Sequence, residues 1–367
     1  QVEKVEILPS NNPANNVYSF SKGNPIITFS IGSTNKLLRP SSLRINGRLT
    51  VLNAAGNNPN NNTLDGTPPA GKAGNIQLNP RLGINSIFQN VNINSNDTNQ
   101  TLESVRQYGR MIATVLPSTH SSEDFLNNTG CVELNPGMQN LSSSYNNNTC
   151  NFSTRLFCGM LNGGNAIPLG VNGVRGLAFS LELASDQMVL SGTDAGANGG
   201  ASYQIDNLSL TCDLLVPDVE GQNKLSIAGS GSFQYNSYNN LYSVIDASDA
   251  TQTCNLAQSN VLNIFHNFLP VSHANNYGQD SFATQGPQLT GSSGSTYDSS
   301  AIINKVSFSR GGMKLALDYD LDVSQQSQEN RPITGVMVNA LNAVNPFNNI
   351  THLLNQPLLF SGILPLV

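Results

Sequence analysis

Apolar and polar side chains alternate along much of this chain. Residues 25–32 and 42–53 place an apolar side chain at every second position, which is the period of a half-buried β-strand. Similar patterns predict further strands at 84–94, 155–162, 177–184, 187–190, 203–216, 224–227, 233–245, 261–271, 302–309 and 314–321. Many short strands separated by loops indicate an all-β protein built of antiparallel sandwiches or barrels, with no α/β sheet.

One segment instead has helical spacing. Residues 101–116 predict a helix, because apolar side chains recur there every three or four positions, at Leu102, Val105, Tyr108, Ile112 and Val115. Glu103 would lie in the first turn of this helix. A mixed pattern at 333–343 favours a second helix. Residues 54–75, 119–154 and 279–299 are rich in Asn, Gly, Ser or Pro, and we expect long surface loops there.

The length of the chain predicts two domains. Its 367 residues suit two β domains of roughly 150–200 residues each. The turn-forming pair Pro217 and Asp218 follows the longest predicted strand, so we expect domains at 1–218 and 219–367. Since a jelly roll has eight strands in two sheets, the predicted strands fit two tandem jelly rolls.

The chain has few charges. Only 11% of the residues are charged, and 17 basic and 23 acidic side chains give a net charge of -6. No basic block is available to neutralise a run of phosphates, so we expect no direct binding of nucleic acid. No apolar run reaches the ~18 residues of a membrane span, and the first residues lack the layout of a signal peptide. We therefore expect a soluble protein.

The five cysteines include no CxxC pair. We expect free thiols in a reducing compartment, although Cys131 and Cys150 flank an Asn-rich segment and a disulfide between them stays an alternative. N-x-S/T triplets occur at Asn61, Asn96, Asn127, Asn147, Asn151, Asn207 and Asn349. Because a chain rich in Asn, Ser and Thr produces such triplets by chance, we do not read them as glycosylation sites.

The search for catalytic and metal-binding motifs yields one candidate. Asp318, Asp320, Asp322 and Glu329 reproduce positions 1, 3, 5 and 12 of a calcium-binding EF-hand loop. Position 6 is Val323 instead of glycine, and the preceding residues read as a strand, so we favour a solvated strand face over a calcium site. We expect no catalytic residue, no cofactor and no bound metal.

Histidines and tyrosines add no clear ligand site. His266 and His273 flank Pro270 without the spacing of a metal site. Tyr235 and Tyr242 lie in one predicted strand but would face opposite sides of it. Core and interface contacts are therefore favoured over a sugar-binding platform.

Four segments, in this order, resemble the double jelly-roll major capsid proteins of Polintons, virophages and related viruses, a lineage that includes adenovirus hexon. They are 17–53 (with YSFSKGNPIITFSIG and LLRPSSLRINGRLTVLN), 81–116, 255–271 (NLAQSNVLNIFHNFLPV) and 304–323 (NKVSFSRGGMKLALDYDLDV), the last followed by a similar segment at 331–343. The resemblance lies in the shared order across both halves of the chain rather than in one strict motif. The chain departs from the family at its end, where the apolar run 357–367 predicts a strand in need of a partner and a final strand is missing from the pattern.

The resemblance implies a structural function. Each subunit would hold two jelly rolls side by side, and a homotrimer would form a pseudo-hexameric capsomer of an icosahedral shell, in contact with neighbouring capsomers, penton and minor capsid proteins. The protein would be located in the virion after assembly inside the host cell. The alternatives are a minor capsid, penton or spike protein, a secreted β-sandwich adhesin or lectin, and a β-fold hydrolase.

Overall fold

The computed structural model describes the first part of the chain almost continuously and the second part in short pieces. The described residues are 1–11, 13–52, 77–78, 82–119, 149–171, 174–191, 200–227, 233–244, 253, 263–266, 274–277, 281–282, 305–306, 308–310, 313–315, 321–322 and 362–365. The predicted loop 54–75, most of the predicted loops 119–154 and 279–299, and the predicted helix 333–343 lie outside them.

The chain divides into two units. The first comprises Gln1–Ile112, Leu126–Leu241 and Asn275–Asp280, and the second comprises Ala113–Phe125, Tyr242–Ala274 and Ser281–Val367. In the described residues, no helix is both long and apolar enough to cross a membrane.

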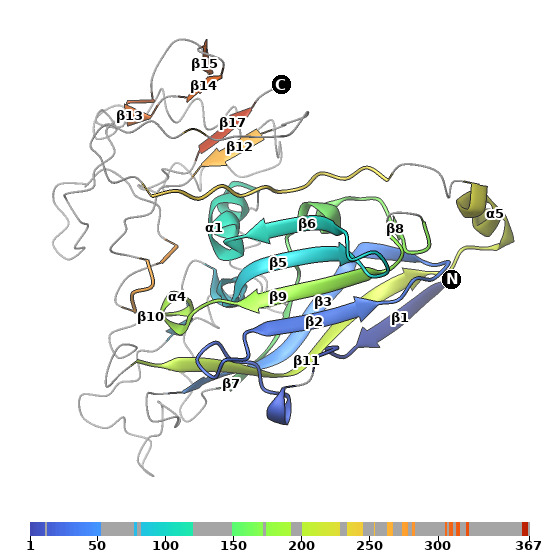
Figure 1. Ribbon diagram of the computed structural model, residues 1–367, viewed down its shortest axis with the longest axis horizontal. Coiled ribbons are helices and arrows are strands. Elements are labelled where there is room, and N and C mark those ends of the chain that lie inside the picture. The colour runs from blue at the N-terminus through green and yellow to red at the C-terminus, as the bar shows by residue number, and fades with distance from the viewer. Residues whose placement is uncertain are drawn as a thin grey trace. The chain divides into compact units, whose positions relative to one another are not determined.

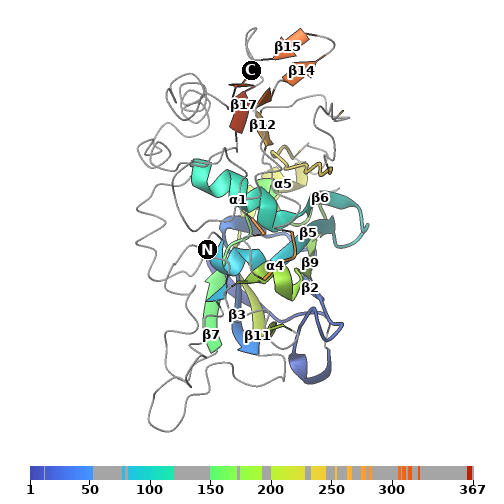
Figure 2. The same ribbon diagram turned by 90° about the vertical axis from the view of Figure 1, so that its left-hand side faces the viewer.

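The first unit is a sandwich of two antiparallel sheets, which Figure 2 shows as separate layers. One sheet has the strand order β1-β11-β3-β7, with β8 paired to β3. Its strands are β1 (Val2–Ile7), β3 (Leu37–Leu52), β7 (Thr149–Thr154), β8 (Ile167–Pro168) and β11 (Ser202–Leu215). The other sheet has the order β2-β9-β5-β6, with strands β2 (Ile26–Ile31), β5 (Phe88–Ser95), β6 (Thr101–Arg106) and β9 (Leu177–Leu183).

The eight long strands of this unit pair in a nested order. The first pairs with the last (β1 with β11), the second with the seventh (β2 with β9), the third with the sixth (β3 with β7) and the fourth with the fifth (β5 with β6). Eight strands that are paired in this way and divided between two sheets form a jelly roll. The prediction of an antiparallel β fold is confirmed for this unit, which is mostly β and forms one jelly roll with a few short helices.

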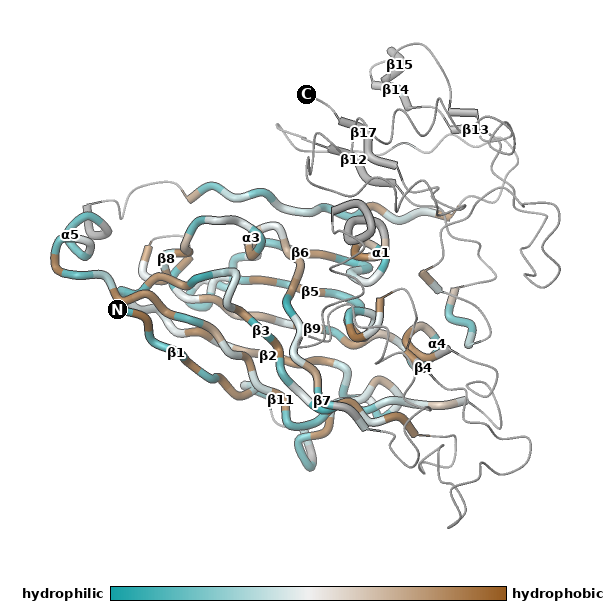
Figure 3. Tube along the Cα trace, turned by 180° about the vertical axis from the view of Figure 1, so that it is seen from behind, coloured by the Kyte–Doolittle hydropathy of each residue, from teal (hydrophilic) through white to brown (hydrophobic). Residues whose placement is uncertain are grey.

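Alternation of side chains builds the core. Along β9 the residues are alternately buried and half-buried, and Figure 3 shows the matching change from apolar to polar along the strands. Phe29 in β2 pairs with Phe179 in β9, and both side chains are buried. Since one face of each strand fills the space between the sheets, the period-2 pattern fixes which residues face the core.

The structure corrects several predicted elements. The predicted helix 101–116 is the strand β6 followed by α1 (Tyr108–Thr119). Three other predicted strands, 155–162, 187–190 and 224–227, overlap helices, which are α3 (Gly159–Asn162), α4 (Asp186–Val189) and α5 (Val219–Ile227). Residues 233–244 lie outside any regular element, and the predicted strand 84–94 begins with the 3-10 helix η2 (Gly83–Ile87). A second 3-10 helix is η1 (Ala14–Asn16), and β4 (Gln77–Leu78) pairs with β10 (Leu190–Ser191).

The misassigned segment shows why spacing alone was misleading. Leu102 and Val105 fit a helical spacing, but Val105 is a core residue of β6 that pairs with Val91 of β5. Gln107 has a positive φ of 53°, a backbone conformation that non-glycine residues seldom adopt and that ends a strand. The true helix therefore starts only at Tyr108.

In the second unit, the described strands form three pairs. They are β12 (Asn263–His266) with β17 (Gly362–Pro365), β13 (Lys305–Val306) with β16 (Leu321–Asp322), and β14 (Phe308–Arg310) with β15 (Met313–Leu315). The apolar run at the C-terminal end thus contains a strand whose partner, β12, belongs to the same chain.

Candidate functional site: the β6 edge and its carboxylate clamp

The residue with the most unusual environment is Glu103. It lies in β6 with only 3% of its surface exposed. Its Oε1 accepts hydrogen bonds from the backbone N–H groups of Gly159 (2.9 Å) and Tyr238 (3.0 Å), and its Oε2 accepts one from Met160 (2.9 Å). We call Glu103 and these three N–H groups the carboxylate clamp.

The clamp joins three segments that are distant in sequence. Gly159 and Met160 open the one-turn helix α3, whose first N–H groups have no partner within the helix. Tyr238 belongs to residues 233–241, an extended segment that we call the strap. A buried carboxylate is costly unless hydrogen bonds satisfy it, so the clamp ties the strap and α3 to β6.

The strap follows β6 in the same direction. Tyr235 donates its hydroxyl proton to the carbonyl oxygen of Leu102 (2.5 Å), and the side-chain amide of Asn240 donates to that of Arg106 (2.6 Å). Figure 1 shows the strap as a yellow trace along β6. Since β6 is the last strand of its sheet, the strap covers the edge through side chains instead of adding a strand.

Gly159 leaves room for the strap. A Cβ atom at this position would lie 2.2 Å from the carbonyl oxygen of Asn236, far inside van der Waals contact. Phe233 and Tyr235 stack at the start of the strap, with ring centroids 5.7 Å apart. The strap therefore packs closely on the start of α3.

The electrostatics of the clamp follow from its burial. Burial raises the pKa of the Glu103 carboxyl above its ordinary value, and the N–H groups of Met160, Tyr238 and Gly159 oppose that rise. The pKa of Cys158 is raised well above its ordinary value, first by burial and then by the charge of Glu103. Burial and the same charge also raise the pKa values of Tyr235 and Tyr238. Such a thiol is not a reactive thiolate, so the cluster has the chemistry of a structural joint.

A second buried carboxylate lies near another segment that returns to the first unit. Asp186, 8% exposed, accepts the backbone N–H of Tyr203 (2.9 Å). Tyr277, in the segment Asn275–Asp280, donates its hydroxyl proton to the carbonyl oxygen of Ala201 (2.6 Å). Its ring lies against Gly200, where a Cβ atom would come within 2.7 Å of the ring. Burial and the charge of Asp186 raise the pKa of Tyr277 to about 12.

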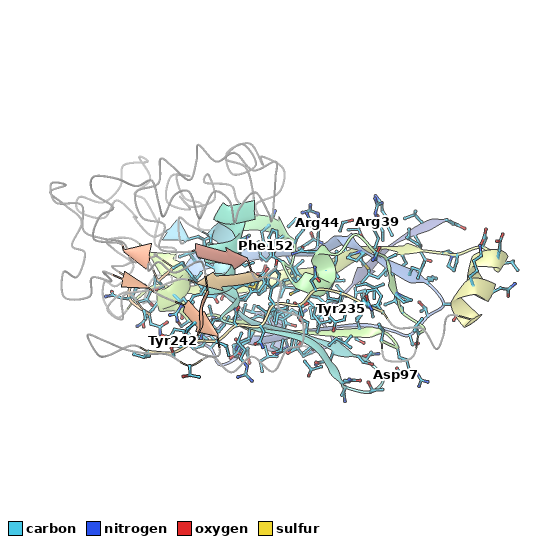
Figure 4. The ribbon with its side chains drawn as sticks, turned by 90° about the horizontal axis from the view of Figure 1, so that it is seen from above. Arg39, Arg44, Asp97, Phe152, Tyr235 and Tyr242 are labelled. Atoms are coloured by element: carbon cyan, nitrogen blue, oxygen red, sulfur yellow. The ribbon has the colours of Figure 1, made fainter. Side chains whose placement is uncertain are left out.

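The opposite edges of the two sheets are β1 and β2. Large apolar side chains are exposed on or beside these strands, at Val2, Leu8, Phe20 and Ile26. Arg39 and Arg44 project from the outer face of β3, and Asp97 lies at the turn between β5 and β6 (Figure 4).

The structure places few of the residues singled out in the sequence. Asp318, Asp320 and Glu329 lie outside the described residues, as does His273, while Asp322 and His266 lie in β16 and β12. Tyr235 contacts β6, whereas Tyr242 is 58% exposed. Cys158 and Cys212 are free and buried. Across the described part of the chain, no three His, Cys, Asp or Glu side chains are grouped to hold a metal ion.

Sequence reasoning missed Glu103 and Asp186. The partners that mark Glu103 are backbone N–H groups, which have no sequence signature. If residues 101–106 are read as a strand with period 2, Glu103 becomes a lone carboxylate at a core-facing position, and this is the signal that could have identified it.

Topology defines the class of the first unit, an antiparallel jelly-roll sandwich. Solved structures similar to this chain come from virus capsids. They include the capsid of the virus PBCV-1 (15% identity, TM-score 0.35), the Sputnik virophage (14%, 0.37) and the mavirus major capsid protein (12%, 0.31).

The matched regions are partial. They cover 62%, 60% and 59% of this chain and 44%, 48% and 47% of the PBCV-1, Sputnik and mavirus chains, in that order. The chain thus matches less than half the length of each of these structures. No protein-family model matches it, and no curated protein matches it.

Proposed function

We propose that this chain is a major capsid protein, a structural subunit with two tandem jelly rolls that assembles with copies of itself into a virion shell. Support for the first jelly roll is its nested strand order. Support for the capsid function is the ordered resemblance of four segments along both halves of the chain. The function is assembly, and no catalytic residue is assigned.

The observation that carries the second jelly roll is the order of the strand pairs after residue 241. β12 pairs with β17, and this pair encloses the β13–β16 and β14–β15 pairs, which form one interrupted hairpin because only position 307 separates β13 from β14. A pair that encloses a hairpin also occurs in the nested order of the first unit, which has four pairs. The boundary after residue 218 stays a prediction.

The proposed assembly is a trimer. Three chains with two similar domains each present six domains, so a three-fold symmetric block fills a site of six-fold shape in a closed shell. Neighbouring capsomers, pentons and minor capsid proteins are then the proposed partners. Interfaces between copies would order neutral loops that are entropically costly to order in one subunit alone.

Light scattering combined with negative-stain electron microscopy tests this proposal. Purified protein should have the mass of three chains and show outlines of hexagonal shape. A stable monomer at micromolar concentration would contradict the trimer. Particles with five-fold symmetry would instead favour a penton protein. A glycosylated monomer would favour an adhesin.

A further inference from the structure

We propose that the strap, residues 233–241, is an edge guard: it closes the β6 edge of the first jelly roll and so prevents this edge from pairing with β6 of a second copy. This inference goes beyond the assembly function and does not depend on it. Edge strands carry unpaired backbone groups that recruit other strands, and proteins cover such edges with loops, charges or bulges.

The contacts of the strap fall on the groups that an added strand would use. Leu102 and Arg106 are four residues apart in β6, so their backbone groups point to the same side of the strand. Their carbonyl oxygens accept hydrogen bonds from Tyr235 and Asn240 of the strap. Tyr238 lies between these two residues and is held by Glu103.

The strap has no regular secondary structure. It therefore occupies the carbonyl oxygens of Leu102 and Arg106 without presenting a new row of strand hydrogen bonds to the solvent. A strand in its place would only move the open edge outward by one position.

A second copy is the proposed partner because β6 can pair with itself. In an antiparallel pair centred on Ser104, Leu102 would face Arg106 of the other chain and Glu103 would face Val105. No like charges would then be opposed, a condition that favours cross-strand pairing. Thr101 and Arg106, at the ends of β6, are exposed.

Gly159→Ala tests the proposal in the full chain. The added methyl group would overlap the Asn236 carbonyl oxygen, so it should displace the strap without a substitution in β6 or in the strap itself. Gly163→Ala is the matched control, since it follows the same short helix and the atom nearest to its added methyl group is 3.8 Å away.

Two measurements are needed. Hydrogen exchange should show at least about tenfold faster exchange of the Tyr238 amide in Gly159→Ala than in wild type or Gly163→Ala. Sedimentation velocity should show additional, larger species in Gly159→Ala alone at the same protein concentration. Adding Leu102→Lys should remove these species, because the new positive charge would face Arg106 of the second copy.

Either of two results overturns the proposal: an unchanged Tyr238 amide in Gly159→Ala, or a released strap without additional association. If Gly159→Ala does not fold, Tyr235→Phe combined with Asn240→Ala replaces it, since both substitutions remove only strap contacts. The same two measurements then decide. If the wild-type protein does not form trimers, that result contradicts the proposed function and not the edge guard. The edge guard is tested by the larger species that appear in Gly159→Ala and are absent from the wild type.

Discussion

Glu103 shows how a single residue can join three parts of the first unit. Its carboxylate is buried, and both oxygens accept hydrogen bonds from backbone N–H groups. Removal of one partner of a buried hydrogen bond usually costs about 1–3 kcal/mol, because the other partner is left unsatisfied. Substitutions at Glu103 therefore act on the strap and on α3 together.

Acidity should modulate this residue in a defined direction. The pKa of Glu103 is raised above its ordinary value of 4.5 by burial, so the native state binds the proton more tightly than the unfolded chain does. Its contribution to the free energy of unfolding is then greatest at pH values below 4.5 and decreases as the pH rises through the native-state pKa.

Glu103→Gln isolates this effect, because the amide does not titrate. The free energy of unfolding of the wild type minus that of the variant should decrease between about pH 4 and pH 7. Denaturant titrations at several pH values measure it. Cys158, Tyr235 and Tyr238 have raised pKa values and stay protonated over this range. A difference that increases with pH would mean that the N–H groups outweigh burial.

Core and surface phenylalanines should differ strongly. Phe29 is 1% exposed and pairs with Phe179, whereas Phe20 is 43% exposed. Phe29→Ala should lower the free energy of unfolding by about 3–5 kcal/mol through lost burial and a cavity. Phe20→Ala should cost less than about 1 kcal/mol. Equal losses in urea titrations would place the core elsewhere.

At the scale of elements, strands with one face toward the core could be predicted and short helices could not. Predicted strands at 25–32, 177–184 and 203–216 correspond to β2, β9 and β11, because alternation reports the two faces of a sheet directly. α3 and α4 have four residues each, which is too short for a helical period to show. Their positions depend on contacts with distant segments.

The candidate site could not be predicted for a related reason. The strap contacts β6 residues more than 130 positions earlier in the chain, and each of these hydrogen bonds joins a side chain to a backbone group. Periodicity reports which face a residue occupies, not which segment covers an edge. The tyrosines at 235 and 238 were visible in the sequence, but their partners were not.

The nested pairs of the second unit can be tested by cross-linking. Ile264 in β12 pairs with Leu364 in β17, and side chains directly opposite each other in antiparallel strands are close enough for a disulfide. A chain with Ile264→Cys and Leu364→Cys should form this bond on oxidation, as peptide mass spectrometry would show. The control pair, Ile264→Cys with Leu315→Cys of β15, should not form a disulfide. Equal cross-linking of both pairs would contradict the pairing of β12 with β17.

At the scale of the whole molecule, low charge should govern assembly. With 11% charged residues and a net charge of -6, contacts between copies would rely mainly on neutral side chains. Light scattering across about a tenfold range of salt concentration should therefore show little change in the assembled fraction, because screening acts on charged pairs. A steep decrease with salt would indicate charge-driven interfaces.

The pairing of β1 with β11 has a consequence for synthesis on the ribosome. Val2 pairs with Leu215, so the first sheet stays open until this late strand has been translated. The hairpin of β5 and β6, with partners such as Val91 and Val105, can form much earlier. Since distant pairings slow folding, the nascent chain would carry β1 unpaired until β11 has been translated, and factors that bind exposed strands could bind β1 during that time.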